Sequence, residues 1–236
     1  MKKISASLLV YNERHNLEKT IKKAYEDLEN SSLEFELWIF DNNSNDGTDL
    51  LVNSLLKKYK NLRYYKQEKN FGYAVNCQAA LKMPESDYYF VIDGDGQYDF
   101  ESVKECVEIL DSGYDILVGI RKPRRDAKFR IFMSFVLKIL SKIILDSKLK
   151  DINSGFRCMT KYAASKINFK YKYNFAGPEI YALSILKKLQ ITEKIINHHP
   201  RVGGRSELSG LKKLTINSLL MIKYMTYLRN DIKKSK

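Results

Sequence analysis

The first half of the chain alternates between strand-like and helix-like patterns. Short runs rich in apolar, β-branched and aromatic residues are separated by segments with the apolar spacing of amphipathic helices. The strand-like runs cover 4–11, 35–41, 62–67, 88–93 and 115–120, and the helical segments cover 16–29, 49–59, 72–83 and 101–113. Strands that alternate with helices of this length build βαβ units. The sequence therefore predicts an α/β fold with a Rossmann-like, mostly parallel central sheet flanked by helices.

The second half of the chain lacks this clean alternation. An amphipathic segment at 126–146 precedes KDINSGFR at 150–157, and later segments predict a helix at 177–189, a strand at 191–199 and a final helix at about 211–229. The 236 residues include only four prolines and no Gly/Ser-rich linker. We therefore expect one domain over 1–236, in which the second half builds the second wall of a cleft.

Composition restricts where such a protein works and what it contacts. The three cysteines form no CxxC pair, which argues against a disulfide framework or a zinc site and favours a reducing, cytoplasmic compartment. No run reaches the ~18 apolar residues of a membrane span. The formal net charge of +13 fits a solvated basic surface, or attraction to the phosphates of a nucleotide, a nucleic acid or an anionic membrane.

Three polar clusters follow predicted strands: YNER at 11–14, DNNSNDGT at 41–48 and DGDGQ at 93–97. Ligands bind beyond the carboxyl ends of parallel strands, so these clusters should converge on one rim. Asp93, Asp95 and Gln97 alternate with glycines, and alternate residues of an extended chain point the same way. Their oxygens suit Mg²⁺ or Mn²⁺, so we predict a metal site there. The alternative is a polar turn that only ends the strand.

Asp41 closes the second predicted strand, where a carboxylate commonly meets a ribose hydroxyl or a base N–H. Asp46 and Thr48 are expected to cap the following helix. Neither a GxGxxG motif after the first strand nor a GxxxxGK[ST] motif occurs. A dinucleotide-binding fold and a P-loop NTPase are therefore not supported.

Seven motifs together resemble a known family. VYNERHNL, DNNSNDGT, KNFGYAVNCQAAL and VIDGDGQYDF are similar, in order and spacing, to family 2 glycosyltransferases. VGIRKPRRDAKFR, KDINSGFR and HHPRVGGRSELSG resemble the branch with the polyprenol-phosphate (dolichol-phosphate) mannose and glucose synthases. The resemblance, over roughly 4–210, implies a GT-A fold, a nucleoside-diphosphate sugar donor, Mg²⁺ or Mn²⁺, and inversion at the anomeric carbon. Residues 1–120 would form the nucleotide-sugar half and 121–236 the acceptor side.

The resemblance also implies roles for individual residues. The nucleotide site would comprise Tyr11, Asn12, Glu13, Asp41, Asn70, Asp93 and Gly94. The metal and diphosphate site would comprise Asp93, Asp95 and Gln97. The catalytic set would be Asp95, Arg121, Arg130 and Asp151, with Arg157, Arg205 and Ser206 on the acceptor phosphate. The chain departs from the family at Leu9, where proline is usual, and at Asn42, where a second acid often follows.

The role of Asp151 depends on the acceptor. A polyprenyl phosphate needs no strong base, because a phosphate monoester, with a second pKa of about 6, is largely dianionic near neutral pH. A saccharide hydroxyl needs a carboxylate to take its proton, and Asp151 is then the best candidate. A helix cap and an ion pair with Arg157 are the structural alternatives for this residue.

Segment 126–146 has an apolar face with Lys138, Lys142 and Lys148 nearby, which suits a peripheral membrane contact as well as a core helix. The favoured function is transfer to a polyprenyl phosphate on the inner face of the cytoplasmic membrane. The rivals are a hydroxyl-directed transferase of surface polysaccharide synthesis and a basic nucleic-acid-binding protein. No RNA- or DNA-binding motif is visible, so nucleic acid is not an expected partner.

Overall fold

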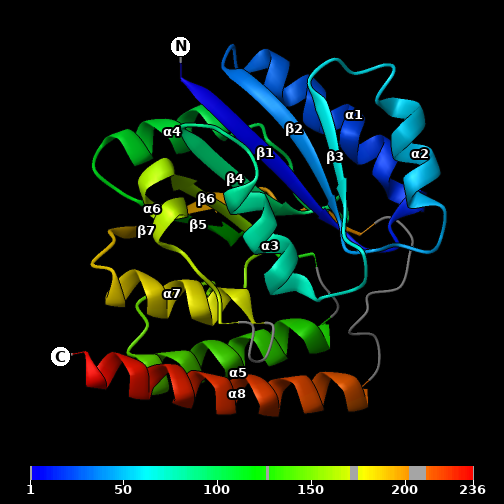
Figure 1. Ribbon diagram of the computed structural model, residues 1–236. Coiled ribbons are helices and arrows are strands. Elements are labelled where there is room, and N and C mark those ends of the chain that lie inside the picture. The colour runs from blue at the N-terminus through cyan, green and yellow to red at the C-terminus, as the bar shows by residue number, and fades with distance from the viewer. Residues whose placement is uncertain (1, 126–127, 171–174, 202–210, 236) are drawn as a thin grey trace.

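The computed structural model describes residues 2–125, 128–170, 175–201 and 211–235, without the side chains of 128–130 and 211–215. A seven-stranded sheet with the order β3-β2-β1-β4-β6-β5-β7 forms its centre (Figure 1). The strands are β1 (Lys3–Val10), β2 (Glu34–Asp41), β3 (Leu62–Lys66), β4 (Tyr88–Asp93), β5 (Ile116–Arg121), β6 (Phe156–Thr160) and β7 (Ile191–Ile196). The predicted mostly parallel sheet is confirmed.

Strand β6 is the element that the sequence pattern did not reveal. It runs antiparallel to both β4 and β5, while the other pairings in the sheet are parallel. Its five residues, FRCMT, directly follow the polar turn of the KDINSGFR motif and are too few to show an alternating pattern. Strand β6 runs opposite to each of its two neighbours, so β4 and β5 run parallel to each other. Both therefore end at the same edge of the sheet.

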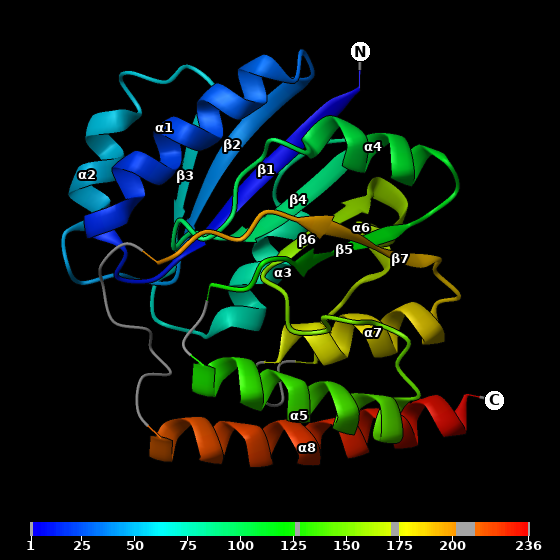
Figure 2. The same cartoon turned by 180° about the vertical axis from the view of Figure 1, so that it is seen from behind.

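Helices cover both faces of the sheet. They are α1 (Arg14–Asn30), α2 (Thr48–Leu55), α3 (Tyr73–Lys82), α4 (Val103–Asp111), α5 (Lys128–Leu145), α6 (Lys161–Lys166), α7 (Ala176–Leu186) and α8 (Leu211–Lys234). One core lies between the sheet and α1, α2 and α4, and the other lies under α3, α6 and α7 (Figure 2). Successive strand residues such as Leu8 and Leu9 enter opposite cores, as the two-residue period of a strand requires.

Helices α5 and α8 lie side by side as an outer layer beyond α7 (Figures 1 and 2). Helix α5 buries Leu137 and Leu145 but leaves a stripe of large apolar side chains in solvent, namely Phe132 (59% exposed), Phe135 (57%), Ile139 (43%) and Ile143 (65%). The segment is therefore packed along one side and open along the other. None of the helices in the described part of the chain has the length and apolarity to cross a bilayer.

Strand register brings the polar clusters to one level. Val10 is opposite Asp41, and Leu9 is opposite both Phe40 and Asp93, so β1, β2 and β4 end together. Ile92 is opposite Phe156, which places the turn before β6 at the same edge. The clusters that are far apart in the sequence therefore meet because their strands stop at one height.

Candidate functional site

A cavity of about 400 Å³ opens at this edge, between the strand ends and the α5–α8 layer. Asp93, Asp95 and Gln97 form one part of its wall, and Arg121 and Arg157 form another. Leu137 of α5 and Met221 of α8 add apolar surface. The structure thus brings together five of the predicted site residues, two acids, an amide and two arginines, in one cleft.

Asp93 sits in a chain of buried polar contacts. The hydroxyl of Tyr73 donates to Asp93 Oδ1 (2.8 Å) and accepts from Arg157 Nη1 (3.1 Å). Arg157 is 3% exposed, so its charge is held at the cleft wall with little water around it. Gly155 is required here, because a Cβ at this position would collide with the Asp93 carboxylate. Tyr73 therefore fixes the orientation of both a carboxylate and a guanidinium group of the site.

Asp95 makes a different set of contacts. Arg201 Nη1 donates to Asp95 Oδ2 (2.9 Å), and Arg201 Nη2 donates to Glu13 Oε1. Burial and the nearby charge of Asp93 nevertheless raise the pKa of Asp95 to about 7. Burial also raises the pKa of Glu13, although Arg201 opposes this shift. Burial of the two carboxyls, with a further contribution from neighbouring acids, therefore outweighs the effect of Arg201 on their pKa values.

Gln97 links two distant parts of the chain. Its carbonyl accepts from the backbone N–H of His199 (2.8 Å), and its side-chain Nε2 donates to the His199 carbonyl (3.3 Å). The His199 ring also contacts Asp99 (Nε2 to Oδ2, 2.7 Å). These contacts dock the segment after β7 against the DGDGQ loop, and they place Arg201 beside Asp95.

Asp151 pairs with Arg121, not with Arg157. Arg121 Nε and Nη2 each donate to a carboxylate oxygen of Asp151 at 2.7 Å, and both residues are buried. This two-pronged geometry is the strongest form of a guanidinium–carboxylate contact. Among the alternatives for Asp151, the structure therefore supports an ion pair, with a partner that sequence reasoning did not name.

The residues that are predicted to contact a nucleoside lie in three neighbouring loops, which are joined by hydrogen bonds. Asp41 is fully buried, and its carboxylate accepts from the Ser44 hydroxyl (2.6 Å) and the Tyr64 hydroxyl (2.8 Å). Ser44 in turn accepts from the backbone N–H of Asn12 (2.8 Å). Asp41 thus organises the loop that follows β2, and contact with a nucleoside stays a prediction.

The other donor-side residues complete this edge. Asn70 accepts from the side chain of Asn42 (2.8 Å), and half-buried Tyr11 follows β1 directly. Gly94 donates its N–H to Leu9 (2.8 Å), and a Cβ there would meet Val10. The glycine therefore allows the loop after β4 to cross close to β1.

Three predicted residues are not tested by these contacts. Arg205 and Ser206 lie outside the described residues, as does the side chain of Arg130, whose backbone begins α5. The structure adds Arg201 and Tyr73 as residues that sequence reasoning missed. A basic residue in the loop after a strand was the only signal for Arg201, and Tyr73 was hidden in an ordinary helical pattern.

The donor set fits a divalent cation of one particular type. Within the described residues, no group of three or more His, Cys, Asp and Glu side chains is placed to hold a metal. Mg²⁺, however, is usually bound through one or two carboxylates together with substrate phosphates and water. Asp93 and Asp95 match that pattern, and burial together with the charge of Asp93 raises the pKa of Asp95, an effect that a bound cation would oppose. The side-chain amide N–H of Gln97 donates to the His199 carbonyl, so the amide oxygen is a candidate metal ligand.

Comparison with known proteins identifies the family. The sequence profile described as Glycosyl transferase family 2 matches residues 5–167. The chain belongs to this family. A curated relative from Salmonella choleraesuis (strain SC-B67), named undecaprenyl-phosphate 4-deoxy-4-formamido-L-arabinose transferase, is 23% identical over 218 residues. That match covers 92% of this chain but only 65% of the relative, so the chain spans about two thirds of the relative's length.

Solved structures confirm the expected GT-A fold. Glucosyl-3-phosphoglycerate synthase from Mycobacterium tuberculosis, in complex with Mn²⁺ and UDP-glucose, superposes with a TM-score of 0.72 at 15% identity. The match covers 97% of this chain and 79% of that chain. The same enzyme with Mn²⁺, UDP and glucosyl-3-phosphoglycerate gives a TM-score of 0.71, also at 15% identity, over 97% of this chain and 80% of that chain. At this level of identity the likeness establishes the fold alone.

The first prediction concerns Asp95→Asn in metal-free protein. The pKa of this carboxyl is about 3.9 in the unfolded chain and about 7 in the folded protein. The folded protein therefore loses stability as the pH rises between these two values, by up to about 4 kcal/mol. Asparagine removes that charge. We expect urea unfolding in chelator to show a more stable variant at pH 8, with the difference shrinking toward zero at pH 4. Adding Mn²⁺ with a nucleoside diphosphate should stabilise the natural protein but not the variant. A variant that is less stable at pH 8 than at pH 4, relative to the natural protein, would contradict the assignment.

The second prediction concerns Gly155→Ala. The new Cβ would displace the Asp93 carboxylate from Tyr73, so Mn²⁺-dependent nucleotide binding should fall at least tenfold. Gly113→Ala is the control, because no atom lies within 4 Å of its added Cβ and its only penalty is the positive φ of 109°. Calorimetry of nucleotide binding to both variants separates the displacement of Asp93 from the general penalty of alanine at a glycine position. Equal nucleotide affinities would show that the position of Asp93 does not matter.

Proposed function

We propose that this protein transfers a sugar from a nucleoside-diphosphate sugar to a polyprenyl phosphate, with inversion at the anomeric carbon. The observation that carries the proposal is that carboxylates, guanidinium groups and apolar side chains line one cleft: Asp93 and Asp95, Arg121 and Arg157, and Leu137 and Met221. The carboxylates suit a cation and the donor diphosphate. The arginines suit a second phosphate, and the apolar surface of α5 and α8 suits a hydrocarbon chain.

The donor is proposed to lie along the strand-end loops. Loops 11–13, 42–44 and 70–72 are tied to one another by hydrogen bonds, which gives a base and a ribose a rigid surface at the end of β1 and β2. The diphosphate would then reach Asp93 and Asp95 through a divalent ion. That ion, when bound, would neutralise charge on the departing nucleoside diphosphate. Mg²⁺ and Mn²⁺ both match the oxygen ligands.

The chain's own residues would align the acceptor. Arg157 is fixed by Tyr73, and Arg121 is fixed by Asp151, so both guanidinium groups are oriented before a ligand arrives. Such preorganised donors need no reorganisation as charge shifts, which is the main source of electrostatic catalysis. They would hold the acceptor phosphate with one oxygen directed at the anomeric carbon, opposite the leaving diphosphate.

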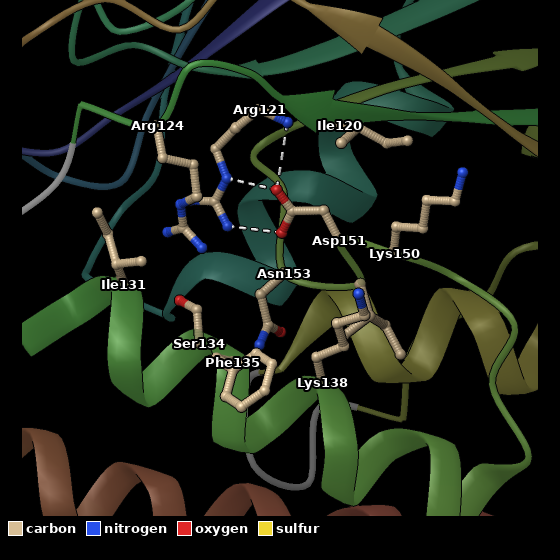
Figure 3. Close-up of a pocket in the computed structure, with 11 residues that line it drawn as sticks. Ile120, Arg121, Arg124, Ile131, Ser134, Phe135, Lys138, Lys150, Asp151 and Asn153 are labelled. Atoms are coloured by element: carbon tan, nitrogen blue, oxygen red, sulfur yellow. Dashed lines mark hydrogen bonds and ion pairs between the residues drawn. The ribbon is translucent and has the colours of Figure 1, made fainter. Parts of the chain in front are cut away.

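The state of Asp151 favours a phosphate acceptor over a hydroxyl acceptor. Both carboxylate oxygens of Asp151 already accept short hydrogen bonds from one guanidinium (Figure 3), so neither oxygen is held toward an acceptor hydroxyl. A lipid phosphate brings its own negative charge and needs no base. The names of the curated relatives, which are undecaprenyl-phosphate sugar transferases, agree with this acceptor class.

The outer layer supports a peripheral contact with an anionic membrane surface. Helix α8, which packs against α5, also exposes Ile216 (47% exposed) and Leu219 (62%), and Lys138 and Lys142 of α5 are exposed. Apolar side chains flanked by lysines are typical of helices that lie in a bilayer interface. This arrangement would bring the lipid acceptor to the cleft, because side chains of the same two helices line it.

The third prediction tests the acceptor. With radiolabelled donor and Mn²⁺, the protein should glycosylate a polyprenyl phosphate and leave saccharide acceptors unlabelled. Asp151→Asn should lower the transfer rate by less than about tenfold, since it only weakens the support of Arg121, whereas loss of a general base lowers rates by about 10²–10⁴. Glu193→Gln is the matched control, because Glu193 accepts from the backbone N–H groups of Lys150 and Asp151 and not from the side chains of the ion pair.

Labelled saccharides together with a loss of 100-fold or more in Asp151→Asn would instead assign the hydroxyl-directed alternative. Absence of both transfer and slow Mn²⁺-dependent donor hydrolysis would favour a binding protein, such as the nucleic-acid-binding rival.

The fourth prediction tests the membrane face. Burying an apolar side chain contributes about 1.5–3 kcal/mol when burial is complete, so losing two partly inserted side chains should weaken vesicle binding at least about tenfold. Phe132→Ser combined with Ile143→Ser should show this loss in sedimentation with anionic vesicles. Leu50→Ser is the control, since Leu50 is 72% exposed but lies on α2. An equal effect of Leu50→Ser would remove the α5 stripe from the proposal.

A further inference from the structure

One arginine joins two acids that come from different loops. The Nη1 group of Arg201 donates to Asp95 Oδ2 (2.9 Å), and its Nη2 group donates to Glu13 Oε1. The side chains of these three residues are only 10–19% exposed, so the contacts are largely shielded from water. Charges attract each other more strongly in such a place than at the open surface. Arg201 therefore acts as a counter-ion that the protein itself supplies to Asp95.

Both carboxylate oxygens of Asp95 are engaged. Oδ1 accepts from the backbone N–H of Gln97 (3.1 Å), which belongs to the same loop, and Oδ2 accepts from Arg201. The first contact is part of the turn of the loop, whereas the second comes from a long side chain that can rotate away. Two cations on one carboxylate oxygen repel each other. A divalent ion that binds through Asp95 therefore competes with Arg201.

The backbone next to Arg201 is held independently of the arginine side chain. His199 donates its backbone N–H to the Gln97 carbonyl (2.8 Å), accepts from the Gln97 side chain (3.3 Å) and contacts Asp99 through its ring (2.7 Å). These contacts lie two residues before Arg201. The guanidinium can therefore leave Asp95 while the segment stays docked, so an exchange of cations needs only a side-chain movement.

The two acids do not use every donor of Arg201. Its Nε–H group is buried, and within the described part of the chain this group has no hydrogen-bond partner. A buried donor without a partner carries a free-energy penalty. A diphosphate offers several acceptor oxygens in the geometry that a guanidinium binds best. The position beside Asp95 is thus one that the guanidinium leaves readily when such an anion is present.

We propose that Arg201 competes with the divalent cation for Asp95, and so makes tight binding of the ion depend on an anion that takes over the guanidinium. When a free ion binds, Arg201 gives up Asp95 and gains no new partner. When the ion binds together with a diphosphate, Arg201 finds acceptor oxygens within reach. Ion and diphosphate then bind cooperatively. The part of the diphosphate rests on the proposed function, whereas the competition for Asp95 does not.

The alternative is that Arg201 only fastens the segment after β7 to the DGDGQ loop. The two roles predict opposite effects on the affinity for a free ion. Loss of a fastening arginine leaves this affinity unchanged or lowers it, because Asp95 is then less well positioned. Loss of a competitor raises it. A gain in ion affinity is therefore a result that a merely structural role does not produce.

The experiment compares two variants that each remove one positive charge near Asp95. Arg201→Gln removes the competitor. Lys19→Gln is the control: Lys19 is exposed and lines a cavity of about 230 Å³ together with Asp95, but in the described part of the structure it forms no ion pair with that residue. Mn²⁺ alone is the first probe. Its binding is measured by calorimetry at about pH 8 and about pH 9, because protons also compete for carboxylates.

We expect Arg201→Gln to bind Mn²⁺ alone at least about tenfold more tightly than the natural protein does. This corresponds to about 1.4 kcal/mol, close to the lower end of what a hydrogen bond to a charged group contributes. Lys19→Gln should stay within about twofold, because the charge of an exposed lysine is screened. Arg201→Lys keeps the charge but not the fork that reaches both acids, so its affinity should lie between those of Arg201→Gln and the natural protein.

A second set of titrations uses UDP and GDP, each with and without Mn²⁺. The factor by which Mn²⁺ strengthens nucleotide binding should be at least about tenfold smaller in Arg201→Gln than in the natural protein, because the coupling is reciprocal. An equal factor in both proteins would overturn the cooperative part of the proposal.

The titrations with Mn²⁺ alone decide the competition. An unchanged or weaker Mn²⁺ affinity in folded Arg201→Gln would overturn it, as would an equal gain in Lys19→Gln. If Arg201→Gln does not fold, Arg201→Lys takes its place, and an affinity no higher than that of the natural protein rejects the competition. These titrations need neither donor nor acceptor. If the gain appears while no nucleotide binds and no sugar is transferred, the competition stands and the proposed function fails.

Discussion

The placement of two partly buried carboxylates at the end of β4 is the constraint to which the rest of the site is fitted. Burial, together with the nearby charge of Asp93, raises the pKa of Asp95 to about 7. The fold supports each carboxylate separately: Tyr73 links Asp93 to Arg157, and Arg201 donates to Asp95.

Each counter-charge comes from a different part of the chain, and this couples the site to the topology. Arg157 is delivered by β6, the strand that runs against its neighbours, and Gly155 allows that strand to pass close to Asp93. Arg201 is delivered by the segment after β7, which Gln97 and His199 dock against the DGDGQ loop. The antiparallel strand is therefore not an irregularity of the sheet. It is the element that places a cation beside the acidic loop.

The Arg121–Asp151 pair fixes a second guanidinium in the wall of the cleft, because both carboxylate oxygens of Asp151 accept from it. The outer helices α5 and α8 add apolar surface to the cleft and expose more of it to solvent.

Local patterns in the sequence determined the alternation of strands and helices, the parallel character of most of the sheet and the position of DGDGQ at a strand end. These features depend on neighbouring residues, through side-chain periodicity and the polarity of short segments. The partners of the charged groups depend on contacts across many residues, and no local pattern encodes them. Asp151 therefore could not be matched to Arg121 from the sequence, Arg201 and Tyr73 were missed, and the five residues of β6 were too few to show their period. Whether α5 is a core or a surface helix was also decided only by tertiary packing, because it packs against α8 and buries Leu137 and Leu145 while Phe132, Phe135, Ile139 and Ile143 stay exposed.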